Sequence, residues 1–382
     1  MNQRRRRYQL KNAELNEQLE ALVEAAAATY GYEGQTETVR QILVTALRLM
    51  RQKADEGDMR LINASLKELR HSFQVFERHK NIRKVSVFGS ARTREDHPDW
   101  KFAHEFASRI AEAGWMVITG AGDGIMGAAQ AGAGRSNSFG VNIRLPFEQS
   151  ANKFIAGDEK LINFRYFFSR KVVFVKESHA IALFPGGFGT HDEGFETLTL
   201  VQTGKAQLLP IVCIDPPGST YWKEWGQFIE NQLLRRGLIS PHDRALYKIT
   251  GDVDEAVDEI LNFYSNYHSS RFVGDLLVLR VRRGPSEEQL DQLNGDFSDI
   301  VVKGRIKSGP ALPEEVAEKD VAHYPRVYFE FNRRDLGRLR EMVDRLNTFV
   351  PEHSSPAEEA VPQLVPEGVI TAEDVAAEEE EV

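Results

Sequence analysis

Hydrophobic side chains recur at helical spacing through the first 80 residues of the chain. The pattern predicts three helices: one near residues 15–23, one opening at Thr36, and one over about residues 58–79. Within each helix the apolar positions share one face; they are Leu15, Leu19, Leu22, Val23, Val39, Ile42, Leu43, Ala46, Leu47, Met50, Leu66, Leu69, Phe73 and Phe76. We therefore expect an N-terminal helical region over residues 1–80.

From residue 82 onward, short apolar runs alternate with segments of helical spacing. The predicted strands cover residues 85–88, 115–119, 139–143, 161–164, 180–184 and 209–214. The predicted helices cover residues 100–113, 166–178, 221–235 and 252–266, and two more follow glycine-rich turns. Strands that alternate with helices form a parallel sheet covered on both faces. Residues 81–266 are therefore expected to form a Rossmann-like α/β domain with a doubly wound parallel sheet.

The last third of the chain has a different order of elements. A strand at 276–281, a helix at 287–293, strands at 300–302 and 327–331, and a helix at 335–349 give the order β-α-β-β-α. We expect a small α+β domain over residues 267–350 that resembles the ACT type. Such a domain would bind a small-molecule regulator or mediate assembly, and a domain that only packs fits the pattern equally well. Residues 351–382, rich in Pro, Ala and Glu, are expected to form a disordered acidic tail.

One glycine-rich stretch carries the strongest chemical signal. The apolar strand at 180–184 runs into Pro-Gly-Gly-Phe-Gly-Thr-His-Asp-Glu at residues 185–193, and a helix is expected to begin at about Thr190. Glycines let backbone N–H groups approach a ligand, and a helix N-terminus attracts an anion, most often a phosphate. Asp192 and Glu193 would fall in the first helical turn. There they would either complement the helix dipole or act on the sugar attached to the phosphate.

A second glycine-rich turn, residues 120–127, follows the strand at 115–119 and ends in Met126 and Gly127. Because the carboxyl ends of parallel strands lie on one rim, both turns are expected to contribute to one site. The second turn superficially suggests a dinucleotide-binding domain. However, its glycine spacing does not match G-x-G-x-x-G after the first strand, and no acidic ribose ligand lies at the expected distance.

The string at 185–193 resembles the P-G-G-x-G-T-x-x-E signature of the LOG family. Three further blocks support the resemblance in family order: the first-strand turn at 87–91, the Met-Gly turn at 120–127, and Ser-Arg-Lys at 169–171. Characterised members are nucleoside 5′-monophosphate phosphoribohydrolases, including enzymes that release free cytokinins. The resemblance covers roughly residues 80–265. His191 departs from the family pattern, in which small or apolar residues are common at this position, and this leaves the base preference open.

The resemblance implies a purine nucleoside monophosphate such as AMP as substrate, no cofactor, and a homodimer or larger homo-oligomer. By position, the family's catalytic residues correspond to Arg170 and Glu193. Glu193 would stabilise an oxocarbenium-like sugar or activate water, and Arg170 would bind the sugar or phosphate and keep Glu193 ionised. The phosphate-binding residues would be Ser90, Gly122, Gly186, Gly187, Gly189 and Thr190. The residues that support the site or contact the base would be Met126, Lys171 and Glu196.

Two other activities compete with hydrolysis. The family is often labelled a lysine decarboxylase, but that reaction needs pyridoxal phosphate and a Schiff-base lysine, and Lys171 belongs to the helix signature. A carrier that binds a nucleotide or cofactor without hydrolysis, as molybdenum-cofactor carriers of similar fold do, would not need both Arg170 and Glu193. His191 could protonate the leaving base, but a solvated role is expected because this helix position often faces outward.

Composition narrows the class of protein further. The net charge of −9 argues against a nucleic-acid partner, and the basic run at residues 4–7 is read as a solvated tip rather than an RNA or membrane contact. The single cysteine, Cys213, excludes a disulfide framework and lies in an apolar run as a small core residue. The histidines and acids lack metal-ligand spacing. No apolar run approaches a membrane span and no signal peptide is evident, so a cytoplasmic location is expected.

Overall fold

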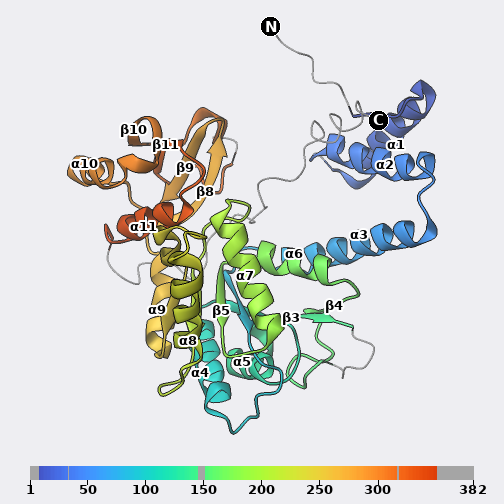
Figure 1. Cartoon of the computed structure of the whole chain (residues 1–382). Helices are drawn as coiled ribbons and strands as arrows, with labels where there is room; N and C mark the ends of the chain where they lie inside the picture. Colours follow the sequence, from blue (N-terminus) through green and yellow to red (C-terminus); the bar gives the residue numbers. More distant parts are fainter. Residues whose placement is uncertain (1–7, 33, 145–150, 316–317, 351–382) are drawn as a thin grey trace. The chain divides into compact units, whose positions relative to one another are not determined.

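The computed structural model describes residues 8–32, 34–144, 151–315 and 318–350 (Figure 1). The described residues divide into two compact units, one that ends at Lys67 and one that begins at Glu68. The predicted acidic tail and the basic run at residues 4–7 lie outside the described residues.

The first unit is helical, as the apolar spacing predicts. Helix α1 (Ala13–Tyr30) begins where the Asn12 side chain accepts a hydrogen bond from the Leu15 N–H at 2.9 Å, and it ends at Gly31 in the left-handed conformation. Helix α2 (Thr36–Arg51) follows, and its Val44 is fully buried, while Leu19 and Val23 are the buried residues of α1. Helix α3 (Glu56–Glu77) runs from this unit into the second one.

The second unit contains a seven-stranded sheet in the order β4-β3-β2-β1-β5-β6-β7, in which every neighbouring pair is parallel. The strands are β1 (Lys84–Phe88), β2 (Met116–Thr119), β3 (Ser138–Ile143), β4 (Leu161–Phe164), β5 (Ala180–Leu183), β6 (Ile211–Ile214) and β7 (Lys248–Thr250). The chain winds outward from β1 to β4, returns to β5 beside β1, and then winds the other way. The prediction of a doubly wound α/β fold is confirmed, and its switch point lies between β1 and β5.

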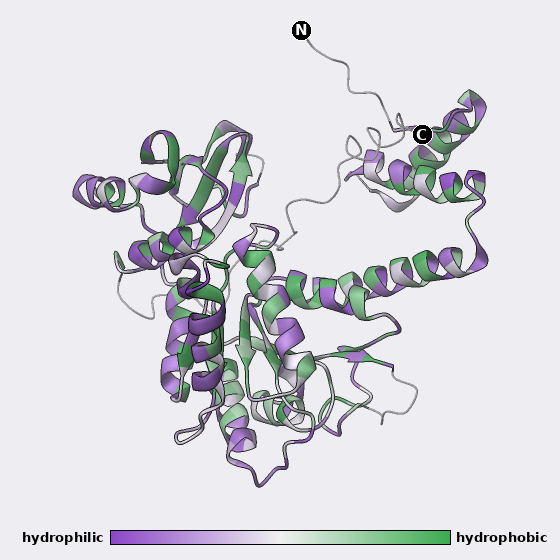
Figure 2. Cartoon of the chain, in the orientation of Figure 1, coloured by the Kyte–Doolittle hydropathy of each residue, from purple (hydrophilic) through white to green (hydrophobic). Residues whose placement is uncertain are grey.

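Helices cover the two faces of this sheet. They are α4 (Pro98–Glu112), α5 (Ile125–Ala133), α6 (Phe167–Glu177), α7 (Phe188–Gln202), α8 (Tyr221–Phe228) with a π-helical continuation over Ile229–Leu234, and α9 (Val253–Phe263). Strands covered on both faces are apolar throughout, and Val85, Val117 and Val212 are fully buried. Figure 2 shows these hydrophobic strands at the centre, with mixed colouring along the helices that cover them.

The end of α3 belongs to the core of the second unit. Phe76 is buried and its ring stacks on that of Phe139 with centroids 4.3 Å apart. The carboxylate of Glu68 accepts hydrogen bonds from the Arg165 N–H at 2.7 Å and from the Ser169 hydroxyl at 2.6 Å. The contacts of Glu68 connect the C-terminal half of α3 to the N-terminus of α6, the helix that contains Arg170.

The C-terminal part of the second unit holds an antiparallel sheet in the order β10-β11-β9-β8. Its elements are β8 (Tyr267–Val273), β9 (Leu276–Val281), α10 (Glu287–Asp296), β10 (Val301–Gly309), β11 (Arg326–Phe331) and α11 (Leu336–Asn347). The predicted order β-α-β-β-α is wrong, because it omits β8. The polar residues His268, Ser269 and Ser270 of β8 interrupt the apolar pattern by which a strand is predicted. The prediction also omits the short strand β7, because this strand contains only one apolar residue.

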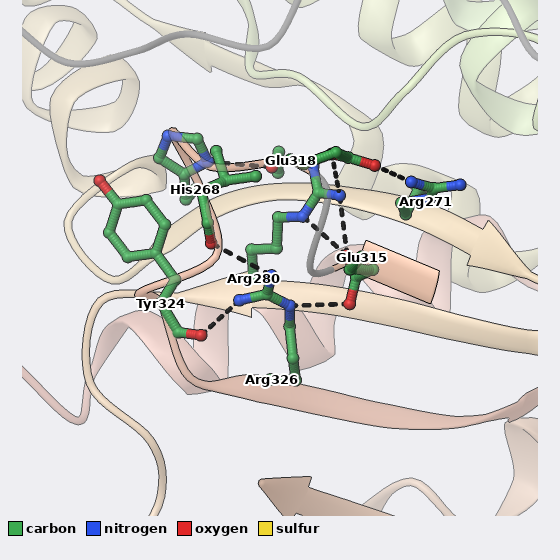
Figure 3. Close-up of polar contacts among 9 residues, drawn as sticks. His268, Arg271, Arg280, Glu315, Glu318, Tyr324 and Arg326 are labelled. Carbon is green, nitrogen blue, oxygen red and sulfur yellow. Dashed lines mark hydrogen bonds and ion pairs between the residues drawn. The ribbon is translucent and has the colours of Figure 1, made fainter. Parts of the chain in front are cut away.

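A buried ion network braces this antiparallel sheet (Figure 3). The Glu315 carboxylate accepts hydrogen bonds from Arg280 of β9 at 2.8 Å and from Arg326 of β11 at 2.9 Å, and all three side chains are buried. Glu318 accepts another from Arg280 at 2.7 Å and pairs with Arg271 of β8. Removing one member would leave a buried charge without its partner. The network therefore holds Glu315 against the strands β9 and β11.

Candidate active site

The turn after β5 feeds directly into α7. The helix begins at Phe188 with Gly187 as its N-cap, two residues earlier than predicted. The sequence did not indicate this start, because Gly189 is a poor helix former. Asp192 and Glu193 therefore lie in the second turn, and the prediction that they occupy the first turn is wrong. The early start leaves the N–H groups of Phe188 and Gly189 without partners inside the helix, which is the arrangement that binds anions.

The glycine at position 186 is required by packing. A Cβ there would collide with the Thr190 hydroxyl, so no other residue fits without displacement. The neighbouring Pro185 carbonyl accepts a hydrogen bond from the Ser90 N–H at 3.0 Å. This bond joins the turn after β1 to the turn after β5 across the switch point.

The second glycine-rich turn packs against the first-strand turn. Gly124 adopts a φ of +62°, and a Cβ on it would collide with the Ser90 carbonyl oxygen. That carbonyl also accepts the Ile125 N–H at 3.0 Å, at the start of α5. The end of the Met126 side chain lies over Gly120 and Gly122, so a Cβ at either position would require Met126 to move. The prediction that the two turns meet on one rim is therefore confirmed.

A cavity of about 1180 Å³ opens at this rim. The predicted residues that line it are Ser90, Gly122, Met126, Arg170, Gly186, Gly187, Gly189, Thr190 and Glu193. Lys171 contacts Glu193, and Glu196 contacts Lys171, but neither residue lines the cavity. The volume exceeds that of ordinary small-ligand pockets, so a mononucleotide would fit within it.

Glu193 is the buried carboxylate of this cavity, with 5% of its surface exposed. Its Oε1 lies 3.6 Å from Nη2 of Arg170, and its Oε2 lies 3.3 Å from Nζ of Lys171. Lys171 also contacts Glu196 at 2.7 Å and Asp192 at 3.0 Å, so it links three acids of α7. The Arg170 guanidinium lies 5.0 Å from the ring centroid of Phe167.

Burial raises the pKa of Glu193 to about 7, although Lys171 and Arg170 pull that pKa downward. Arg170 favours the ionised form of Glu193, but the loss of solvation exceeds the attraction of both cations. Burial lowers the pKa of Lys171, but its hydrogen bonds to Glu196 and Asp192 outweigh burial and raise it overall. The site thus pairs a permanent cation with a carboxyl group that exchanges its proton near neutral pH.

His191 and Tyr221 form a contact that sequence reasoning missed. His191 lines the cavity, and its Nε2 lies 2.7 Å from Oη of Tyr221, so the expectation of a solvated histidine is wrong. Tyr221, the first residue of α8, donates a hydrogen bond to the Gly186 carbonyl at 2.5 Å. No motif marks Tyr221, because its role depends on the fold bringing it beside residues 30 or more positions away.

Other chemistries lack support in the part of the chain that the structure describes. There, no group of three His, Cys, Asp or Glu side chains is arranged to hold a metal ion. Cys213 is buried in β6, and burial raises the pKa of its thiol, which suits a core residue rather than a nucleophile. None of the described helices combines the length and apolar character needed to cross a membrane.

Comparison with known proteins agrees with this geometry. Residues 125–260 match the model of a family described as "Possible lysine decarboxylase". A cytokinin riboside 5′-monophosphate phosphoribohydrolase from Mycobacterium tuberculosis is 28% identical over 166 residues, which are 41% of this chain and 82% of that protein. Both matches are similarities to the LOG family over part of this chain. The matched region runs from the start of α5 into α9 and includes Arg170 and Glu193.

The solved structures that resemble part of this chain include two proteins named for the molybdenum cofactor. The carrier protein from Chlamydomonas reinhardtii is 19% identical with a TM-score of 0.33, over 46% of this chain and 94% of that one. The binding protein from Rippkaea orientalis is 19% identical with a TM-score of 0.33, over 46% of this chain and 91% of that one.

Proposed function

We propose that the protein hydrolyses the N-glycosidic bond of nucleoside 5′-monophosphates to a free base and ribose 5-phosphate. One observation carries the proposal: the buried carboxylate of Glu193 lies beside Arg170, in a cavity that is also lined by the N-terminus of α7. The similarity to a phosphoribohydrolase from Mycobacterium tuberculosis supports the same reaction class.

The phosphate would bind at the N-terminus of α7. Gly187, Gly189 and Thr190 line the cavity at this point, and Ser90 and Gly122 line it from the two neighbouring turns. Holding the substrate by its phosphate places the sugar near Glu193 and turns remote binding energy into positioning of the reacting carbon.

In the chemical step, the bond between C1′ and the base nitrogen breaks, and its electron pair leaves with the base. Ionised Glu193 stabilises the oxocarbenium-like sugar and accepts a proton from the water whose oxygen bonds to C1′. Because its pKa is about 7, Glu193 is ionised in a substantial fraction of molecules at neutral pH and can afterwards release the proton to solvent, from which the departing base takes up the proton that replaces its bond to C1′. Arg170 would bind sugar hydroxyls or phosphate beside it.

The direct test is incubation of the full-length protein with AMP, GMP, CMP and UMP, followed by assay of free base and ribose 5-phosphate. We expect turnover of the purine nucleotides and none of adenosine, because the nucleoside lacks the phosphate. Equal rates on AMP and adenosine would contradict the role of the glycine turn. Binding of monophosphates without any turnover would favour a carrier instead.

We further propose that the regions flanking residues 81–266 assemble or regulate the enzyme rather than supply chemistry, and that it works as a cytoplasmic homodimer or larger homo-oligomer. All the cavity-lining residues lie between Phe88 and Tyr221. Light scattering on the purified protein tests the oligomer. A shortened chain covering the α/β sheet should begin before Glu68, whose carboxylate contacts Ser169.

A further inference from the structure

The hydroxyl of Tyr221 connects the first turn of α8 to the phosphate turn. It lies 2.5 Å from the Gly186 carbonyl oxygen and 2.7 Å from Nε2 of His191. The Tyr221 ring stacks on His191 with centroids 5.8 Å apart and meets Trp222 edge-on at 4.9 Å. Ring packing therefore fixes the phenol, so its hydroxyl is held at one position rather than sampling several.

The protons of this arrangement can be assigned. A carbonyl oxygen only accepts, so the single proton of Tyr221 goes to Gly186, and Tyr221 must accept from His191. Burial raises the pKa of Tyr221, which keeps that proton in place at neutral pH. Burial lowers the pKa of His191, so the ring is neutral there, with its one proton on Nε2. A neutral imidazole whose proton is committed to Tyr221 is a poor acid for a leaving base.

The peptide between Gly186 and Gly187 is the group that this chain of bonds orients. In a trans peptide the carbonyl and the following N–H point in opposite directions. With the Gly186 oxygen directed at Tyr221, the Gly187 N–H is turned away from it. A rotated peptide would instead present a carbonyl oxygen, which repels a phosphate.

We propose that Tyr221 and His191 are positioning residues that hold the 186–187 peptide with its N–H available to the substrate phosphate. The inference rests on the proposed function for the identity of the anion. Two other hydrogen bonds hold the same turn, from the Ser90 N–H to the Pro185 carbonyl and from the Thr190 N–H to the Gly187 carbonyl. Neither of them fixes the Gly186 carbonyl, so Tyr221 supplies the restraint that the turn otherwise lacks.

The substitution Tyr221→Phe removes the hydroxyl and keeps the ring. Calorimetry with AMP, ribose 5-phosphate and adenosine should show roughly tenfold weaker binding of the two phosphate ligands, the scale of one hydrogen bond to a charged group. Adenosine binding should not change. The single-turnover rate at saturating AMP should fall less than the affinity. His191→Gln keeps an N–H that can donate to Tyr221 and should bind AMP nearly as the wild type does.

Tyr247→Phe is the matched control, since this tyrosine packs on Trp225 with ring centroids 5.1 Å apart and does not line the cavity. It should leave AMP affinity unchanged. Nitrogen-15 NMR of labelled histidines, with the His191 signal assigned through His191→Gln, tests the hydrogen bond between His191 and Tyr221 without any ligand. The wild type should show His191 protonated on Nε2, and Tyr221→Phe should lose that preference.

Protonation of wild-type His191 on Nδ1 would overturn the inference, as would unchanged AMP affinity in Tyr221→Phe or an equal loss for adenosine. A wild-type protein that binds neither AMP nor ribose 5-phosphate would overturn it together with the proposed function. Binding of AMP without hydrolysis would reject the proposed function alone, because the affinity comparison between wild type and Tyr221→Phe still decides the positioning role.

Discussion

The guanidinium Nη2 of Arg170 lies 3.6 Å from Oε1 of Glu193, although the carboxyl group beside it has its pKa raised to about 7. The pair comes from two helices, α6 and α7, that flank the strand β5. Burial therefore weakens the ionised form of Glu193 more than its neighbours strengthen it. A carboxyl group in that balance serves proton transfer better than a permanent ion pair does.

The substitution Arg170→Ala removes a cation that lines the cavity and contacts Glu193. We expect both the affinity for AMP and the single-turnover rate to fall, each by about tenfold or more, because a hydrogen bond between charged groups is lost in the ground state and in the transition state. Calorimetry and rapid-quench assays on the same protein preparation measure the two effects. A variant with normal AMP affinity and only a slower rate would mean that Arg170 does not contact bound substrate.

Glu193 also makes stability depend on pH. Its pKa is about 7 in the folded protein and ordinarily 4.5, so the folded state holds this proton after the unfolded chain has lost it. Wild-type stability should therefore decrease as pH rises from about 4.5 to about 7, by roughly 3 kcal/mol from this group, and stay level above. Glu193→Gln should lack that decrease.

Urea unfolding of wild type and Glu193→Gln at pH 5 and pH 8 measures this effect. On going from pH 5 to pH 8, the free energy of unfolding of the variant should rise relative to that of the wild type. Glu159→Gln, at an exposed carboxyl paired with Arg78 at 2.8 Å, controls for the substitution itself. An identical difference between variant and wild type at both pH values would show that burial does not raise the pKa of Glu193.

The glycines of the phosphate turn should differ from one another. Gly186→Ala places a Cβ against the Thr190 hydroxyl, whereas Gly187→Ala places one in open space. We expect Gly186→Ala to lower the free energy of unfolding by about 1–3 kcal/mol, the usual cost of overpacking, and Gly187→Ala to change it little. Thermal unfolding measures both. Equal melting temperatures for the two variants would contradict the packing at Gly186.

Much of the sheet could be predicted because its strands are buried on both faces and read as apolar runs. The strands at β1, β2, β3, β5 and β6 follow from that pattern, and the rule for carboxyl ends then brings the two glycine turns together. The strand β8 could not be found in this way, since the polar run from His268 to Arg271 interrupts the apolar pattern.

The side-chain contacts of the site depend on three-dimensional proximity that no local pattern encodes. Arg170 and Glu193 were found through a family resemblance, but the pKa of Glu193 depends on how deeply the fold buries it. Tyr221 carries no motif, and its bond to Gly186 spans 35 positions in sequence. The same limit explains why His191 was expected in solvent, since the partner that covers it could not be foreseen.

The most direct test of Glu193 as the catalytic carboxylate is single-turnover hydrolysis of AMP by wild type and Glu193→Gln, paired with AMP affinity by calorimetry. The substitution keeps size and removes the negative charge that faces the developing oxocarbenium. We predict that the rate falls by roughly a hundredfold or more, the scale for a positioned acid–base group, with AMP binding retained or slightly tighter. Near-normal turnover by Glu193→Gln would contradict the assignment and make Asp192 or Glu196 the next candidate.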